Sequence, residues 1–187
     1  MLPPPRIRWI DDPSDPARTG VLDLYCQAFA EAPYFEAHDP ADVEQHTWRR
    51  YAGLGLVVAE HHDQVVGFAC CLPLTAHPDP TIPQFVSHQP DFSGQVDRTV
   101  YMAELAVSPV ARGLGLGARL VDARLAYAHS KGLGWFVMRT DPHQSLSARI
   151  YRRRGAVALA TLQDLGAAAG SQSRYRRFYW GATQVGV

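Results

Sequence analysis

The sequence predicts one α/β domain built around a mixed β-sheet, and three observations support this. With 187 residues, the chain is long enough for one domain with a substantial core and short for two. Hydrophobic residues make up 47% of the chain and charged residues 19%, which is the balance of a globular rather than a disordered protein. Segments with strand and helix periodicity alternate along the chain, and two pairs of strands are placed to form hairpins.

The N-terminal segment is expected to form a weak strand followed by two helices. The strand covers residues 6–10. An Asp-Pro pair opens each helix, at Asp15-Pro16 and at Asp39-Pro40, with Asp as the N-cap and Pro at the first helical position. Pro33 is expected to end the first helix, and the second runs to about residue 51.

A hairpin and a long loop are expected next. Two strands at residues 55–60 and 65–72 flank the turn of the hairpin. Residues 73–97 contain five prolines and show no periodicity. A stretch of this length without regular structure is usually a functional loop in a compact domain, so we expect a loop or lid here.

The second half of the chain alternates regularly between strands and helices. The expected elements are a strand at 99–107, a helix at 112–131, a strand at 135–140, a helix at 145–154 ended by Gly155, and strands at 156–162 and 174–180.

The net charge of zero hides a division between two parts of the chain. Residues 1–110 carry fifteen Asp and Glu against six Lys and Arg, whereas residues 111–187 carry three against twelve. The two parts therefore have balances of −9 and +9. This pattern suggests two partners of opposite charge, and it equally suits two solvated faces that interleave in the fold.

Cysteine usage and hydropathy favour a cytoplasmic protein with no membrane partner. The cysteines are Cys26, Cys70 and Cys71, and the two neighbours would point to opposite faces of a strand, which favours neither a disulfide nor a zinc site. No apolar run approaches the roughly 18 residues that a membrane span needs, and the first residues lack a signal-peptide pattern. No spacing of His, Cys and carboxylates predicts a metal site.

The strongest local signal is a glycine-rich turn between a strand and a helix. The strand ends at Leu105-Ala106-Val107, and the turn reads Arg112-Gly113-Leu114-Gly115-Leu116-Gly117-Ala118. Alternating glycines let the backbone wrap closely around a ligand, and their N–H groups form an anion site with the helix N-terminus. Arg112 adds a guanidinium fork for phosphate oxygens. A Walker loop is excluded because Gly-Lys-Ser/Thr is missing, and a dinucleotide fingerprint because Ala118 and Leu120 stand where its third glycine would be.

This strand and turn resemble the coenzyme-A loop of the GNAT acetyltransferases, whose pattern is Arg-x-x-Gly-x-Gly after Leu-Ala-Val-x-Pro. A later segment, residues 145–156, is similar to a second motif of the family, with Tyr151 and Gly155 in its Tyr-x-x-x-Gly. Ser145 stands where the family usually has Asn, and Ala156 replaces an aromatic residue. Two motifs in the right order make the resemblance specific over roughly residues 99–160.

The resemblance implies a GNAT-like three-layer domain with a mixed, mostly antiparallel central sheet flanked by helices, covering residues 1–187. Residues 1–98 would form the acceptor side and residues 99–160 the acetyl-CoA-binding core. The implied activity is the transfer of an acetyl group from acetyl-CoA to a primary amine by direct attack, without a metal. Leu105, Ala106 and Val107 would offer backbone groups to the pantetheine arm. The pyrophosphate would lie on Arg112, Gly113, Leu114, Gly115, Leu116, Gly117 and Ala118, with further cofactor contacts from Ser145 and Ala148.

The resemblance also implies catalytic roles. Tyr151 would lie near the sulfur and protonate the departing thiolate, which suits a phenol with a pKa of about 10. The attacking amine must lose a proton, because a free alkylamine is mostly protonated at neutral pH. Glu104, on the strand next to the acyl group, is the first candidate for the base, and Tyr101 on the same strand is the second.

The acceptor is expected to lie against residues 31–44 and 73–97, since these segments flank the end of the cofactor in the architecture that the chain resembles. They carry eight carboxylates and no Lys or Arg. Carboxylates and aromatic faces attract cations. The predicted substrate-binding residues are Glu31, Tyr34, Phe35 and Phe85, and the expected acceptor is a cationic small molecule, such as an aminoglycoside-like compound or a polyamine, or a lysine or N-terminal amine of a peptide.

Two other functions compete with the enzyme. A coenzyme-A-binding sensor or pseudoenzyme would keep the glycine loop, but the presence of both Tyr151 and Glu104 favours catalysis. Residues 174–180 mix arginines and aromatics as in single-strand nucleic-acid binders. The acidic first part of the chain would oppose phosphate, so no nucleic-acid partner is expected. The sequence does not determine the oligomeric state and is compatible with a homodimer.

Overall fold

The computed structural model describes residues 4–31, 34–143, 145–166 and 174–184. The strands are β1 Arg6–Trp9, β2 Leu56–His61, β3 Gln64–Pro73, β4 Thr99–Val107, β5 Trp135–Thr140, β6 Val157–Asp164 and β7 Tyr175–Ala182. The α-helices are α1 Arg18–Ala30, α2 Pro40–Val43, α3 Arg49–Tyr51, α4 Thr81–Ser87, α5 Leu116–Ser130 and α6 Leu146–Arg152. A π-helix, η1 Glu44–Trp48, joins α2 to α3, and the 3₁₀ helices are η2 Leu74–Ala76, η3 Val96–Arg98 and η4 Pro109–Ala111.

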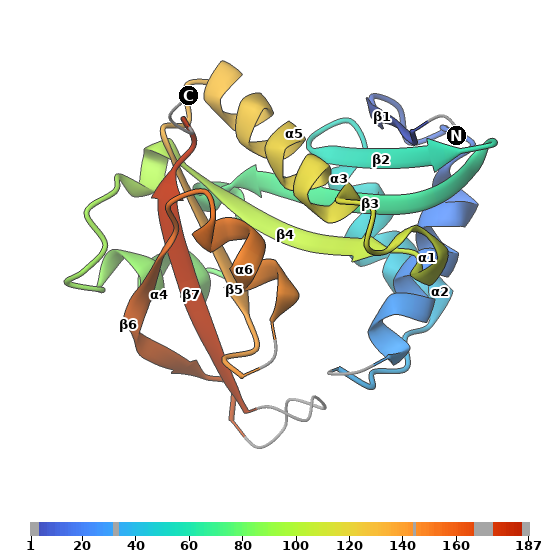
Figure 1. Ribbon diagram of the computed structural model, residues 1–187. Helices are drawn as coiled ribbons and strands as arrows, with labels where there is room; N and C mark the ends of the chain where they lie inside the picture. The colour runs from blue at the N-terminus through green and yellow to red at the C-terminus, as the bar shows by residue number, and fades with distance from the viewer. Residues whose placement is uncertain (1–3, 32–33, 144, 167–173, 185–187) are drawn as a thin grey trace. The chain divides into compact units, whose positions relative to one another are not determined.

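The seven strands form a mixed sheet in the order β1-β2-β3-β4-β5-β7-β6 (Figure 1). β4 and β5 run parallel, while β1–β2, β2–β3, β5–β7 and β6–β7 are antiparallel. The sheet is thus mostly antiparallel and flanked by helices, as predicted. Parallel neighbours need a crossover connection, and α5 provides it between β4 and β5.

The chain forms two compact units, each with its own internal packing. Unit 1 contains Met1–Cys71 and Glu104–Arg124, and unit 2 contains Leu72–Ala103 and Leu125–Val187. β3, β4 and α5 each contribute residues to both units.

In unit 1, helices cover both faces of the strands. Leu116 and Leu120 of α5 pack in a buried cluster with Val57 and Ala69 on one face. Phe68 is next to Ala69 and therefore points to the opposite face, where its ring stacks on Tyr25 of α1 with 6.1 Å between centroids. Three layers result, helix on sheet on helix.

Unit 2 repeats this arrangement with different helices. Tyr151 of α6 packs against Phe136 of β5, with ring centroids 5.3 Å apart. Phe85 of α4 stacks on Phe178 of β7 at 5.0 Å. Because Phe178 lies opposite Arg139 in the β5–β7 register, it shares a face with Arg139 and not with Phe136. α4 and α6 therefore cover opposite faces.

The two predicted Asp-Pro helix starts have different outcomes. At the second, Asp39 accepts a hydrogen bond from the Ala41 amide at 2.7 Å with Pro40 in the first turn, and the helical segment ends at Tyr51 as predicted. At the first, the prediction was early by two residues, because α1 begins at Arg18. The Asp15 carboxylate instead accepts from the Ala17 amide within the preceding turn. Pro33 lies outside the described residues.

The predicted structureless loop at residues 73–97 is wrong. The segment contains η2, α4 and the start of η3, and it buries Leu74, Ile82 and Val86. Each element has seven residues or fewer, which is too short for helical periodicity to emerge from a proline-rich sequence. Among the described residues, no helix is long and apolar enough to cross a membrane.

Candidate active site

The glycine-rich turn leads from β4 into α5 in unit 1. η4 follows β4, and the Ser108 amide donates to the carbonyl of Val66 at 2.9 Å, which anchors the end of the strand. α5 begins at Leu116, so the helix start predicted at residue 112 was four residues early. Residues 112–115 instead form the open turn itself.

Two glycines of this turn have a left-handed backbone. Gly113 has φ +78° and Gly115 has φ +73°. A Cβ added at either position would meet nothing within 4 Å. Glycine therefore suits the backbone conformation of this turn, which leads into the N-terminus of a helix of 15 residues. Such an arrangement is typical of anion-binding sites.

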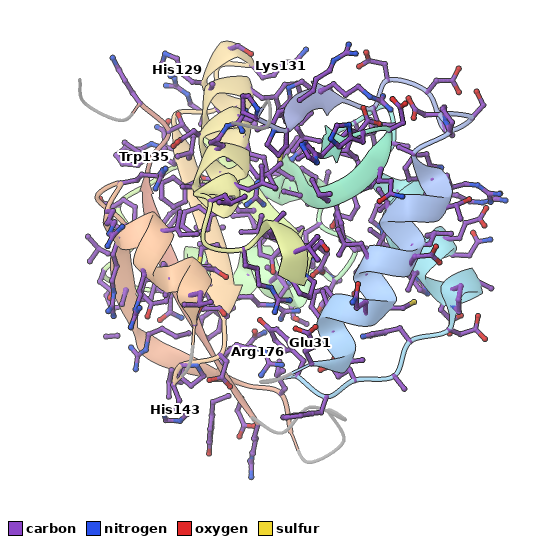
Figure 2. The ribbon with its side chains drawn as sticks, turned by 45° about the vertical axis from the view of Figure 1, so that its right-hand side comes forward. Glu31, His129, Lys131, Trp135, His143 and Arg176 are labelled. Carbon is purple, nitrogen blue, oxygen red and sulfur yellow. The ribbon has the colours of Figure 1, made fainter. Side chains whose placement is uncertain are left out.

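Arg112, at the start of the turn, forms an ion pair with Glu31, which directly follows α1 and is labelled in Figure 2. The Arg112 Nη2 to Glu31 Oε2 distance is 2.7 Å, and both side chains are between a third and a half exposed. The Arg112 Nε also donates to the Val107 carbonyl at 3.1 Å. A residue predicted to bind the donor and one predicted to bind the acceptor thus contact each other.

An aromatic cluster extends from α1 beyond Glu31 in unit 1. Tyr25 stacks on Phe29 with ring centroids 4.4 Å apart and meets the edge of His38 at 5.1 Å, and Phe29 lies 5.1 Å from Tyr34. The His38 Nε2 lies 3.2 Å from the Glu36 Oε2.

Sequence reasoning assigned only Tyr34 of this cluster to the site. It did not assign Tyr25 and Phe29 of α1 to the site. The available signal was two aromatics at i and i+4 directly before a run of acids. Phe35, another predicted substrate residue, is 56% exposed and has φ +51°, a strained conformation for a bulky residue.

The Glu104 carboxylate acts electrostatically on this cluster. Burial raises the pKa of Tyr25 above its ordinary value, and the negative charges of Glu104 and then Glu36 raise it further. The charges of two carboxylates, Glu104 and Glu36, therefore both act on Tyr25 of α1. Both disfavour an additional negative charge there and favour a positive one.

A fully buried arginine supports the strand that carries Glu104. The Nη1 of Arg124, from α5, donates to the Cys70 carbonyl at 2.9 Å and to the Glu104 carbonyl at 3.4 Å. Sequence reasoning did not select this residue, because a charged side chain within a helix is normally solvated. Its guanidinium connects β3 and β4 at the residue whose carboxylate is a candidate base.

The two cysteines of β3 do not have the properties of nucleophiles. Burial raises the pKa of Cys71 to about 11 and that of Cys70 well above its ordinary value. A thiol must ionise to attack, so both remain protonated and inert at neutral pH.

In unit 2, Tyr151 lies in the last turn of α6 and is 1% exposed. Ser145, predicted to contact the cofactor, caps this helix: its hydroxyl oxygen accepts from the Ala148 amide at 3.0 Å and from the Thr140 hydroxyl at 2.9 Å. Ala148 is buried in the first turn.

Tyr101, the second candidate base, also lies in unit 2 and is 6% exposed. The ring of His77 meets it edge-on with centroids 4.6 Å apart. The His77 Nδ1 is held at the backbone of Asp79. Phe85, the fourth predicted substrate residue, is half-buried against Phe178.

Within the described part of the chain, no three His, Cys, Asp or Glu residues gather as a group that could hold a metal ion. The candidate residues of unit 1 are the glycine turn and two carboxylates that act on an aromatic cluster, and those of unit 2 include two buried tyrosines, Tyr101 and Tyr151.

Comparison with known proteins gives a family and a fold. The model of the acetyltransferase (GNAT) family matches residues 20–156 of the chain. No curated protein matches the sequence.

Solved structures share the fold at low sequence identity. An N-acetyltransferase from Staphylococcus aureus Mu50 is 17% identical, with a TM-score of 0.67 and coverage of 96% of this chain and 99% of its own. A ribosomal-protein-alanine N-acetyltransferase from Brucella melitensis is 20% identical, with a TM-score of 0.67 and coverage of 95% and 99%. A GNAT superfamily phosphinothricin acetyltransferase from Sinorhizobium meliloti, in complex with acetyl-CoA, is 15% identical, with a TM-score of 0.66 and coverage of 96% and 89%.

Proposed function

Because the chain belongs to the GNAT acetyltransferase family, we propose that it transfers an acetyl group from acetyl-CoA to a primary amine. The observation that carries this proposal is the turn at the start of α5, where Gly113 and Gly115 have left-handed backbones. Such a turn suits the pyrophosphate of coenzyme A, since it is exposed and leads into a helix N-terminus, which favours an anion. The acetyl-CoA bound to the Sinorhizobium neighbour also supports this donor.

Donor binding is assigned to the residues that the sequence motifs predicted. Arg112 to Ala118 hold the pyrophosphate, and the backbone of Leu105 to Val107 pairs with the pantetheine arm. Ala148 adds a contact from the first turn of α6. Ser145 contributes through its backbone, since its hydroxyl is already used by Thr140 and Ala148.

The proposed reaction is direct attack of the amine on the thioester that acetyl-CoA supplies. Glu104 accepts the amine proton, with Tyr101 as the alternative base, and Tyr151 donates a proton to the departing thiolate. The inertness of Cys70 and Cys71 supports direct attack, because it leaves no thiolate on β3 to take up the acetyl group.

The proposed acceptor is a cationic small molecule or a peptide amine. Support comes from the aromatic cluster around Tyr25, where the charges of Glu104 and Glu36 both act. An ammonium group gains cation–π attraction from Tyr25 and Phe29 and Coulomb attraction from the carboxylates. The protein is further proposed to act in the cytoplasm, which the spacing of its three cysteines favours.

A screen that detects free coenzyme A tests the function. The protein is incubated with acetyl-CoA and a panel of amines comprising polyamines, aminoglycosides, amino acids, amino-acid amides and short peptides. Amine-dependent release of coenzyme A, lost in Tyr151→Phe, is the expected result. Tight binding of acetyl-CoA without release of coenzyme A for any amine would instead indicate a coenzyme-A sensor. Absence of acetyl-CoA binding would refute the proposal that the glycine turn binds the cofactor.

A further inference from the structure

A row of polar side chains crosses one face of the strands in unit 2. Arg139 on β5 lies opposite Phe178 on β7, and Gln163 on β6 lies opposite Arg176 on β7. Residues two apart on a strand share a face, so Arg176 is on the face of Phe178. Arg139, Arg176 and Gln163 therefore share one face of three adjacent strands (Figure 2 labels Arg176).

The same face carries Tyr101, the second candidate base. Tyr101 on β4 lies opposite Val137 on β5, and Arg139 is the next residue of β5 on that face. The two positions are offset by about 7 Å along the strands. Arg139 thus lies two residues along the strands from a tyrosine that is proposed to act on the acceptor.

Arg139 has capacity for a further partner. Its half-buried side chain donates from Nη1 to the Gln163 Oε1 at 3.0 Å, which is a bond to a neutral amide. No carboxylate among the described residues lies within 4.0 Å of its guanidinium. A guanidinium carries five N–H donors in a fork that matches a carboxylate. Partial burial of a cation costs desolvation free energy, which a neutral partner offsets less than an anion does. Binding of an anion would therefore offset this cost.

The charge of Arg139 acts on one carboxylate of unit 2, that of Asp79, which is hydrogen-bonded to Thr81. Hydrogen bonds from the side chain and amide of Thr81 lower the pKa of Asp79, with smaller contributions from the charges of His77 and Arg139. Both bonds end on Oδ1, at 2.7 and 2.9 Å, and fix Asp79 to the start of α4. Thr81 thus holds Asp79 at the start of α4, whereas the Arg139 side chain donates to Gln163 of β6.

Aromatic residues share this face with Arg139, namely Phe178 opposite it on β7 and Tyr101 on β4. Phe85 stacks on Phe178, and His77 meets Tyr101 edge-on. A cation beside apolar rings interacts with an anion in a lower dielectric than water, so a carboxylate would be bound more strongly here than at a fully exposed arginine.

We propose that Arg139 binds a carboxylate of the acceptor, with Arg176 adding positive charge on the same face. This inference rests on the proposed acetyl transfer and narrows its acceptor to primary amines that carry a carboxylate, such as amino acids and peptides. Polyamines and aminoglycosides lack this group and are excluded as best acceptors.

Matched acceptors test the proposal. The free coenzyme A released with acetyl-CoA is measured for L-lysine against L-lysinamide and for L-phenylalanine against its amide. The acids should have at least tenfold higher kcat/KM in the wild-type protein. Arg139→Gln should raise KM for the acids tenfold or more and leave the amides unchanged. Arg98→Gln, which removes an exposed arginine of unit 2, should alter neither.

A second variant protects the test against misfolding. Gln163→Glu places a carboxylate at the position that already accepts the Arg139 hydrogen bond, so the fold gains an ion pair. Arg139 is then no longer available to the carboxylate of the acceptor. It should abolish the preference for acids as Arg139→Gln does. Equal use of acid and amide by the wild type, or an equal loss of both in either variant, would overturn the proposal.

Product binding separates this inference from the proposed transfer. Calorimetry with N-acetyl-L-phenylalanine and its amide needs no turnover. If no amine is acetylated but the wild type binds the acid and Arg139→Gln does not, the carboxylate site stands and the proposed transfer fails. Equal binding of both compounds by the wild type rules out the site.

Discussion

The Arg112 guanidinium and the Glu31 carboxylate form an ion pair of 2.7 Å that joins the start of the glycine turn to the residue after α1. If Arg112 binds the pyrophosphate, Glu31 competes with that anion. Glu31→Gln should therefore tighten acetyl-CoA binding by up to about fivefold, because partly exposed ion pairs are worth about 0.2–1 kcal/mol. Calorimetry measures this, with Glu44→Gln as the control, since Glu44 pairs with Arg18 and Arg49 instead. Weaker binding in Glu31→Gln would show that Glu31 orients Arg112 rather than competing for it.

Gly115→Asp should abolish acetyl-CoA binding, because it puts a side chain and a like charge at the proposed pyrophosphate site. Backbone strain alone would also destabilise the protein by about 1–2 kcal/mol, so a control is needed. Gly132→Asp is matched: Gly132 has φ +76° and equally open space, but it lies at the other end of α5. Similar affinity for acetyl-CoA in the two variants would contradict the assignment of the turn.

Tyr151→Phe should lower kcat by roughly 10²–10⁴-fold, the range for loss of a general acid, with acetyl-CoA affinity nearly unchanged. Steady-state kinetics and calorimetry report the two quantities separately. Tyr179→Phe is the control, since Tyr179 is also buried in unit 2 and its hydroxyl contacts the Arg152 Nη2 at 3.2 Å. A wild-type rate in Tyr151→Phe would make Tyr151 a packing residue.

The KM of a cationic acceptor should rise between low and moderate salt, because ions screen its attraction to Glu36 and Glu104. Circular dichroism over the same salt range checks that the fold is intact. Glu36→Gln should reduce the salt dependence of KM, whereas Asp63→Asn, in the turn between β2 and β3, should not. A salt-independent KM for the best acceptor would contradict electrostatic recognition.

The ion pair of Arg8 with Asp15 makes stability depend on pH. The hydrogen bond from Arg8 holds the pKa of Asp15 below its ordinary value, so the fold favours the ionised carboxylate. This stabilisation is present above the ordinary pKa of about 4 and is lost as the pH falls through the lowered value. Asp15→Asn should therefore lower the free energy of unfolding by about 1.5–3 kcal/mol at pH 7 and by less at pH 3. Urea unfolding at both values measures this, with Asp23→Asn on α1 as the control, and an equal loss at both would exclude ionisation as the cause.

Elements with a strong local pattern could be predicted from the sequence. β4 and β5 occupy the predicted residues, because their apolar runs are bounded by turn residues on both sides. The helix N-cap at Asp39 could also be predicted, because it is a local interaction between residues two apart in the sequence. The glycine turn was recognisable because positions 113 and 115 have a left-handed backbone, which glycine adopts more readily than any other residue.

Features that depend on distant partners could not be predicted. Arg124 interrupts the apolar stripe of α5 and would be placed in solvent by pattern alone, yet it is buried and its Nη1 donates to carbonyls of two strands. The ion pair of Arg112 with Glu31 likewise depends on tertiary structure. The hydrogen bond of Arg139 to Gln163 depends on the register of the strands. Local sequence carries no signal for any of these contacts.

The edge of the sheet is closed at β6 by a carboxylate. The β6–β7 register shifts between Ala158 and Leu162, and within this bulge the Ala160 amide donates to the Asp91 Oδ2 at 2.7 Å. Arg177 occupies the neighbouring Leu159 carbonyl. An incoming strand would find these two groups already bonded and the backbone bent, so another chain cannot extend the sheet along β6 without displacing Asp91. The connection after α4 thereby protects this edge of the sheet against strand addition, and two copies would have to associate through another surface.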